Sequence, residues 1–162
     1  LELVGDDNVA KLKDDKNTPE GSFAAASHHL NQQFPKLTKI ASTYRRTTSA
    51  SHHELGGMLW FAATDSRPSA QVYWAPKSSD DTTANETYSI DHVVDRIGTG
   101  DAFTAGLLYA LTTPELSGPE HAIQFATAAF CLSHSIAGDF NFTSRQEIEE
   151  LIAGDSSGRV QR

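Results

Sequence analysis

A chain of 162 residues with 38% hydrophobic and 21% charged residues has the size and composition of an ordinary globular domain. Its formal net charge of −8 argues against nucleic acid or an anionic membrane as the main partner, because both bind clustered lysine and arginine. A small phosphate ligand is compatible with this charge, since backbone amides and a few side chains can hold it.

The first part of the chain is predicted to contain one helix and several strands. Residues 1–4 look like the end of a strand and residues 5–8 like a turn, an abrupt start that suggests a preceding part of a longer protein. A helix is expected over 21–34, where apolar residues recur at helical spacing after a cap at Gly21 or Ser22. Segments rich in β-favouring residues predict strands at 37–44, 57–64 and 70–75, the last two joined by a hairpin turn at 65–69.

The second part is predicted to contain a polar loop at 76–87 and a short strand at 88–95. Three helices are expected after them, at 101–111, 120–136 and 144–152. Ser144 and Glu147 have the spacing of a capping box at the start of the last helix. Strands mixed with helices favour an α/β layer structure. The helices at 101–111 and 120–136 are apolar over most of their surface, so we expect both to be largely buried.

The stretch GTGD at residues 98–101 joins the short strand to an apolar helix. The first amides of a helix lack partners within it and carry partial positive charge, so a glycine turn at this point can bind phosphate. A carboxylate at Asp101 would repel phosphate, but it suits a base that takes a proton from an attacking hydroxyl. An ordinary capped helix explains the spacing as well. The stretch lacks the Lys-Ser/Thr of a P-loop, and Phe103 replaces the third glycine of a dinucleotide fingerprint.

Residues 95–108, DRIGTGDAFTAGLL, closely resemble the C-terminal signature of the ribokinase-like (PfkB) sugar kinases. The resemblance implies a ribokinase-like α/β sandwich, in which residues 1–162 form a single domain that is the C-terminal, nucleotide-binding half of the fold. Most sugar contacts of such a kinase would then lie outside this sequence. The implied reaction is phosphoryl transfer from ATP to a sugar hydroxyl, with Mg²⁺ bridging the phosphates.

The same resemblance assigns roles to individual residues of the signature. Asp101 matches the catalytic base, and Asp95 matches a position that lies in a monovalent-cation (K⁺) loop in many relatives. The implied anion hole consists of the backbone amides of Gly98, Thr99, Gly100 and Asp101.

Three further stretches resemble the family more weakly. Thr43-Tyr44-Arg45 is similar to the Thr-Leu-Arg of 2-keto-3-deoxygluconate kinases, which implies that Arg45 touches ATP phosphates; a solvated arginine is the alternative. Residues 5–8 match a segment near the metal and phosphates but depart from its Asn-Glu-Glu pattern. Residues 133–141 match a loop near the nucleotide and the cation, with Asp139 as a candidate, although a helix-terminating turn explains this loop as well.

Arg96 and Thr99 resemble a bacterial 2-keto-3-deoxygluconate kinase subgroup, so this sugar acid is the expected acceptor. Fructose, ribose or a nucleoside are alternative acceptors within the same family. A non-catalytic module that binds a nucleotide or phosphate is the alternative from another class. We also expect a homo-oligomer with a small-molecule sugar substrate.

Other reactive side chains are expected to be structural. The seven histidines include two adjacent pairs, at 28–29 and 52–53, but none has the spacing of a zinc helix, so no zinc site is expected. The single cysteine, Cys131, lies in an apolar stretch, which favours a buried core thiol in a cytoplasmic protein. Trp60 and Trp74 are expected to pack in the core or across neighbouring strands.

Overall fold

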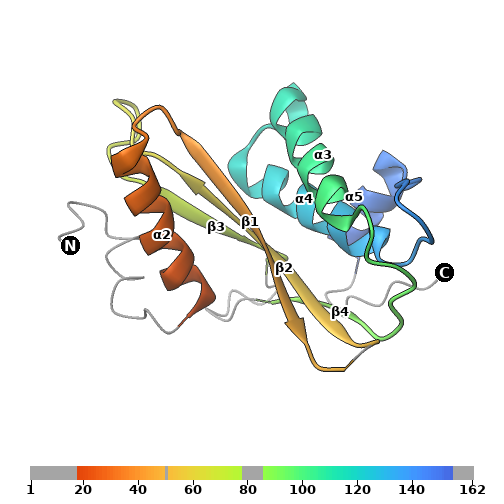
Figure 1. Ribbon diagram of the computed structural model, residues 1–162. Helices are drawn as coiled ribbons and strands as arrows, with labels where there is room; N and C mark the ends of the chain where they lie inside the picture. The colour runs from red at the N-terminus through yellow and green to blue at the C-terminus, as the bar shows by residue number, and fades with distance from the viewer. Residues whose placement is uncertain (1–17, 50, 78–85, 155–162) are drawn as a thin grey trace. The chain divides into compact units, whose positions relative to one another are not determined.

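The computed structural model describes residues 18–49, 51–77 and 86–154 (Figure 1). The predictions for residues 1–4 and 5–8, and for most of the loop at 76–87, lie outside these ranges. The described elements are helix α2 (Pro19–Gln33), strands β1 (Lys39–Thr47), β2 (His53–Phe61), β3 (Gln71–Ala75) and β4 (Tyr88–Ile90), helix α3 (Thr99–Thr112), the 3-10 turn η1 (Pro114–Leu116), and helices α4 (Pro119–Ser133) and α5 (Arg145–Ala153).

The strands form one sheet in the order β1-β2-β3, and β4 pairs antiparallel with β2. In the β2–β4 register, Leu55 lies opposite Tyr88. The hairpin turn predicted between β2 and β3 is confirmed, because Thr64 and Arg67 exchange backbone hydrogen bonds of 2.6 and 3.0 Å. None of the helices among the described residues has both the length and the apolar character needed to span a membrane.

The chain divides into two compact units. The first comprises the described residues up to Ser42 together with Met58–Tyr73. Within it, the Phe61 ring lies edge-on to Tyr73, with centroids 6.0 Å apart. Lys39 and Arg67 place their charges 5.2 and 4.9 Å from the centroid of the same ring, a cation–π arrangement that shields its faces.

The second unit comprises Thr43–Gly57 and the described residues from Trp74 onward, and α4 is the centre of its core. Eleven of the 15 residues of α4 are buried, which confirms the burial predicted for this helix. Gly57 of β2 lies directly against the helices, since a Cβ atom at this position would be 2.2 Å from Thr127 Oγ1 and 3.0 Å from the Phe103 ring. The sheet and the helix pair therefore pack in close contact within this unit.

Helix α3 does not follow the prediction that it is largely buried. One side packs on α4 and buries Ala102, Phe103 and Gly106, while Leu108 and Tyr109 on another side are 58% and 44% exposed. The composition of α3 is apolar on both sides, but its packing against α4 covers mainly one of them. The Tyr109 ring contacts Phe125 of α4, with centroids 5.5 Å apart, and stays partly exposed.

Most element boundaries differ from the predicted ones by a few residues. Helix α2 begins at Pro19 instead of residue 21, because the Thr18 side chain accepts a hydrogen bond from Gly21 N (3.2 Å) and proline suits the first helical position. Strand β1 ends three residues later than predicted, at Thr47. Helix α4 ends at Ser133 instead of residue 136.

The largest boundary differences concern β2 and β4. Strand β2 runs from His53 to Phe61, whereas the prediction was 57–64. It begins earlier because residues 53–55 pair with β4. Strand β4 ends at Ile90 instead of residue 95, since Val94 N leaves the sheet and bonds to His134 O at 2.9 Å.

The last helix follows its prediction closely. Helix α5 begins after Ser144, whose side chain accepts a 3.2 Å hydrogen bond from Glu147 N. The Glu147 carboxylate in turn accepts a 2.8 Å bond from Ser144 N. The predicted capping box is therefore confirmed.

Candidate functional site

The turn before α3 depends on one left-handed glycine. Gly98 is the N-cap of α3 and has φ 74° and ψ −4°, a conformation that residues with a side chain rarely adopt. A Cβ atom at Gly98 would lie 2.5 Å from the backbone oxygen of Asp139 and 3.0 Å from its Cα. Glycine at this position thus permits both the turn and its close approach to the loop after α4.

The backbone N–H groups that follow Gly98 form the first turn of the helix, and they have no hydrogen-bond acceptor within the helix. The first intrahelical bond of α3 runs from Ala102 N to Gly98 O, at 2.8 Å. The amides of Thr99, Gly100 and Asp101 precede it, so they belong to the group of helix-start donors that the helix itself does not satisfy. The buried Thr99 side chain closes the turn by donating to Arg96 O at 3.0 Å. The turn therefore presents backbone donors at the positive end of the α3 dipole.

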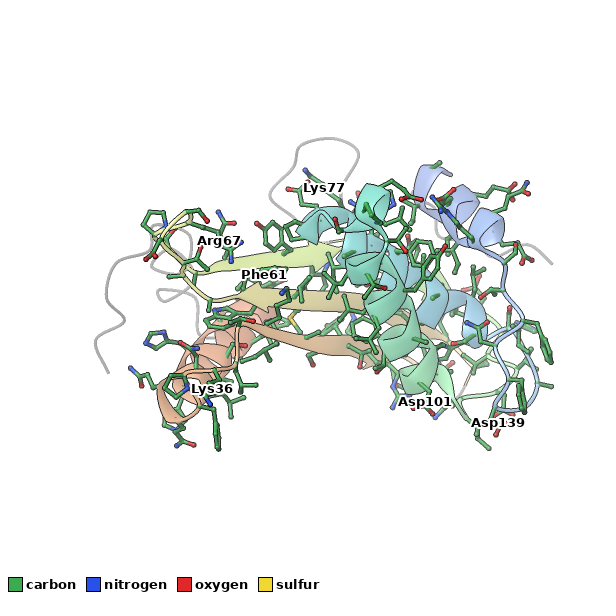
Figure 2. All side chains as sticks on the ribbon, turned by 90° about the horizontal axis from the view of Figure 1, so that it is seen from above. Lys36, Phe61, Arg67, Lys77, Asp101 and Asp139 are labelled. Atoms are coloured by element: carbon green, nitrogen blue, oxygen red, sulfur yellow. The ribbon has the colours of Figure 1, made fainter. Side chains whose placement is uncertain are left out.

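Gly100 and Asp101 both face open surface. A Cβ atom added to Gly100 would meet nothing within 4 Å, so packing does not require glycine there. Asp101 is exposed, and its carboxylate makes no hydrogen bond or ion pair with any residue that the structure describes. Figure 2 shows Asp101 at the start of α3, at the same end of the second unit as Asp139. The fold leaves this carboxylate available to a ligand.

Asp95 organises the entry to the turn. One carboxylate oxygen accepts hydrogen bonds from Arg96 N (2.6 Å) and Ile97 N (3.1 Å), and the other accepts from Gly138 N (2.9 Å). The Gly138 bond, followed by the Ile97 and Arg96 bonds, holds the pKa of Asp95 below its usual range. Both oxygens are thus engaged by backbone amides, and the predicted role of Asp95 beside a monovalent cation stays a prediction.

The loop after α4, which includes residues 134–141, lies against this turn. His134 O accepts hydrogen bonds from Val94 N (2.9 Å) and Asp95 N (3.4 Å). Together with the Asp95–Gly138 bond and the contact between Gly98 and Asp139, these bonds attach the two loops to each other. No local pattern in the sequence marks His134, because the role of its carbonyl depends on a loop about 40 residues earlier in the chain.

Arg45 lies on β1 with an exposed side chain. Burial lowers the pKa of His134, and the positive charge of Arg45 contributes to the same effect, so the Arg45 guanidinium acts on the end of α4. The structure therefore places Arg45 within electrostatic range of the loop that borders the turn. Its contact with ATP phosphates stays a prediction.

The histidine pairs have local partners. His28 and His29 contact Gln32 and Gln33, one turn along α2, at 3.1 and 2.9 Å. His52 contacts the Asp91 carboxylate at 2.8 Å. Within residues 18–49, 51–77 and 86–154, no three histidine, cysteine or acidic side chains come together as a metal site would require.

The predictions for Cys131 and the two tryptophans are confirmed. Cys131 is fully buried, and burial raises the pKa of its thiol, as in an inert core residue. Trp60 is 1% exposed. Trp74 packs on Tyr44 with ring centroids 5.2 Å apart and donates from Nε1 to Glu86 O at 2.7 Å.

Replacing Asp95 by asparagine is expected to loosen the turn. The asparagine amide keeps one acceptor oxygen but turns an NH2 group toward Gly138 N, so that hydrogen bond is lost. The effect on stability is present above about pH 3.8 and disappears as the pH falls through the lower folded-state pKa, where the wild-type carboxylate also becomes protonated. Amide hydrogen exchange at Gly138 and Ile97, at pH 7, measures the change.

Asp139→Asn is the matched control for this change, because no described residue bonds to the Asp139 carboxylate. It should leave the exchange of Gly138 unchanged. Equal exchange rates at Gly138 in wild type and Asp95→Asn would contradict the role given to Asp95.

Comparison with known proteins matches the chain to solved structures of kinases. No protein-family model matches the chain, and no curated protein matches it. A PfkB family carbohydrate kinase from Listeria grayi is similar over 79% of this chain and 34% of its own, with 31% identity and a TM-score of 0.62. A 2-dehydro-3-deoxygluconokinase from Thermotoga maritima is similar over 85% of this chain and 36% of its own, with 26% identity and a TM-score of 0.64.

The chain thus spans about a third of the length of these solved structures. The likeness confirms the predicted resemblance and the ribokinase-like α/β fold class. The roles of the individual site residues stay predictions.

Proposed function

We propose that this chain, which has the ribokinase-like α/β fold and resembles the C-terminal portion of PfkB carbohydrate kinases, is the nucleotide-binding part of a carbohydrate kinase. The reaction is transfer of the γ-phosphoryl group of ATP to a hydroxyl group of a sugar or sugar acid. One observation carries the proposal: Asp101 is exposed and unpartnered among the described residues, and it stands in the same helical turn as the open amides of α3. A base and an oxyanion site therefore adjoin each other.

The proposed chemistry uses both groups. The acceptor hydroxyl attacks the γ-phosphorus, its oxygen–phosphorus bond forms, and the bond from the γ-phosphorus to the bridging oxygen breaks to release ADP. Asp101 accepts the hydroxyl proton. The amides of Gly98, Thr99, Gly100 and Asp101 stabilise the negative charge on the transferred group, aided by the α3 dipole.

Cations are proposed in limited roles. Mg²⁺ bound with ATP neutralises phosphate charge. The described residues offer no cluster of three acidic or histidine ligands, so we propose that the phosphates and water supply most of its ligands. A monovalent cation such as K⁺ beside Asp95 remains part of the proposal, as does the contact of Arg45 with the phosphates.

The proposed acceptor is 2-keto-3-deoxygluconate. Two features favour it: the Thr43-Tyr44-Arg45 and Arg96/Thr99 patterns, and the 26% identity to a protein described as a 2-dehydro-3-deoxygluconokinase. Fructose, ribose or a nucleoside are the alternative acceptors. A homo-oligomer and a cytoplasmic location stay predictions.

The test uses the complete gene product that contains these 162 residues. ADP release is measured with ATP and Mg²⁺ against 2-keto-3-deoxygluconate, gluconate, fructose, ribose and adenosine. The proposal expects the highest kcat/KM with the first. Transfer to another member of the panel would correct the acceptor only. ATP binding by calorimetry without transfer to any acceptor would favour the non-catalytic phosphate-binding module.

Gly100→Ala should distinguish an effect on phosphate binding from an effect on protein stability. Alanine is the better helix former by up to about 1 kcal/mol, and its methyl group would meet open space, so the thermal midpoint should not fall. The same methyl group would stand where a phosphoryl oxygen approaches the amides. We expect kcat/KM for ATP to fall by about tenfold or more, a loss comparable to that of one transition-state hydrogen bond.

Ala105→Gly is the reverse control, at an exposed position further along α3. It should lower stability by about 0.5–1 kcal/mol and leave the kinetics unchanged. If Gly100→Ala has unchanged kinetics as well, the amides of this turn do not bind the phosphoryl group.

A further inference from the structure

We propose that His134 is a positioning residue whose buried side chain fixes the backbone carbonyl that holds the entry to the glycine turn. The catalytic part of this inference rests on the proposed function, but its structural part does not. Four contacts of His134 support it, two made by its imidazole and two by its backbone carbonyl.

The imidazole is anchored on its own helix. It is fully buried, and Nδ1 lies 2.8 Å from Phe130 O. Because a carbonyl oxygen can only accept, Nδ1 carries the proton, and this bond assigns the tautomer. The Phe130 ring stands edge-on to the imidazole, with centroids 4.8 Å apart at 80°. Both contacts restrain the ring on the last turn of α4.

The surroundings keep this ring neutral. The charged and titratable groups that face it are Arg45 of β1, His53 of β2 and Arg96 of the loop before α3. Burial, assisted by the positive charge of these three basic groups, lowers the pKa of His134 against the opposing effect of the hydrogen bond to Phe130 O. Nε2 is left as an acceptor without a hydrogen-bond partner among the described residues. An aliphatic side chain could fill the space, but it could not donate to Phe130 O.

The backbone carbonyl of His134 connects the anchored side chain to the glycine turn through hydrogen bonds. His134 is the C-cap of α4, with φ −67° and ψ −15°, and its carbonyl accepts from Val94 N (2.9 Å) and Asp95 N (3.4 Å). Asp95 in turn binds the amides of Ile97 and Gly138. The position of Gly98 therefore depends, through consecutive hydrogen bonds, on the orientation of residue 134.

A small rotation at residue 134 would displace the turn. Since a misplacement of about 1 Å can reduce a rate by about 10²-fold, Asp101 and the amides would lose their geometry even though no atom of His134 reaches them. His134 is thus expected to influence kcat more than ATP binding.

The experiment compares His134→Leu with His134→Asn in the complete gene product. Leucine fills the space without a donor, whereas the asparagine NH2 group occupies about the position of Nδ1 and can still donate to Phe130 O. His134→Leu should lower kcat by about 10- to 100-fold with a smaller change in KM for ATP, and His134→Asn should recover most of it. His121→Leu and His121→Asn, at an exposed position of α4, are the matched controls and should have no effect.

Amide hydrogen exchange at Val94 and Asp95 is the second readout. Exchange should be faster in His134→Leu and close to wild type in His134→Asn. A lower thermal midpoint with unchanged exchange at these two amides would indicate mere packing and overturn the inference. If His134→Leu does not fold, His134→Gln replaces it, because its longer side chain carries the amide away from Phe130 O. If wild type transfers no phosphate, the proposed function fails, while the exchange results still decide the positioning role.

Discussion

Asp101→Asn is expected to lower kcat by a factor of about 10² to 10⁴, the range for loss of a general base, with little change in ATP affinity. Asparagine has nearly the same shape as aspartate but cannot take the hydroxyl proton. The exposed Asp101 carboxylate has no partner among the described residues. Its loss should therefore change stability by only about 0.5 kcal/mol, through the helix dipole.

The measurement is steady-state kinetics with the best acceptor, combined with ATP binding by calorimetry. Asp65→Asn is the control, because it removes the same charge from an exposed turn in the first unit. It should have wild-type kinetics. Normal turnover by Asp101→Asn would remove Asp101 from the role of base, and a large loss of stability would show that its carboxylate is structural.

Gly98→Ala is the second change with a large expected effect. Left-handed backbone costs a residue with a side chain about 1–2 kcal/mol, and the new Cβ would lie 2.5 Å from Asp139 O. Relieving that contact costs about 1–3 kcal/mol more. Because the turn must move to accommodate the methyl group, we also expect kcat to fall by about 10²-fold.

Gly118→Ala is the matched control for this change, since Gly118 is the N-cap of α4 as Gly98 is of α3. Gly118 has φ −58°, and a Cβ there would meet nothing within 4 Å. Alanine at this cap should cost only a few tenths of a kcal/mol, about what a weak N-cap residue costs. Equal effects of Gly98→Ala and Gly118→Ala on the unfolding midpoint and on kcat would contradict the strained geometry assigned to the turn.

The difference between these two glycines illustrates what local sequence can and cannot reveal. Both precede a helix, and both are followed within two residues by an acidic or small residue typical of a helix start. The left-handed φ of 74° at Gly98 and the backbone of Asp139, 41 residues further along the chain, constrain this position, whereas nothing of the kind constrains Gly118. The fold therefore decides which glycine is functionally constrained.

Features that depend on neighbouring residues could be predicted from the sequence. The capping box of α5 needs only Ser144 and Glu147, three residues apart, and the structure confirms it. The glycine turn, the start of α3 near Asp101 and the burial of α4 follow from short-range spacing and composition in the same way. The family resemblance also rests on one continuous stretch, residues 95–108.

Features that depend on distant residues required the tertiary structure. Strand β4 ends early because Val94 bonds to His134, and the Asp95 carboxylate is engaged by Gly138, 43 residues away. Helix α3 is apolar on both sides, yet its burial depends on which side α4 covers. The sequence by itself determined which groups stand at the helix start, because backbone geometry is local. Only the folded chain decided what holds them there, because hydrogen bonds and packing join residues that the sequence separates.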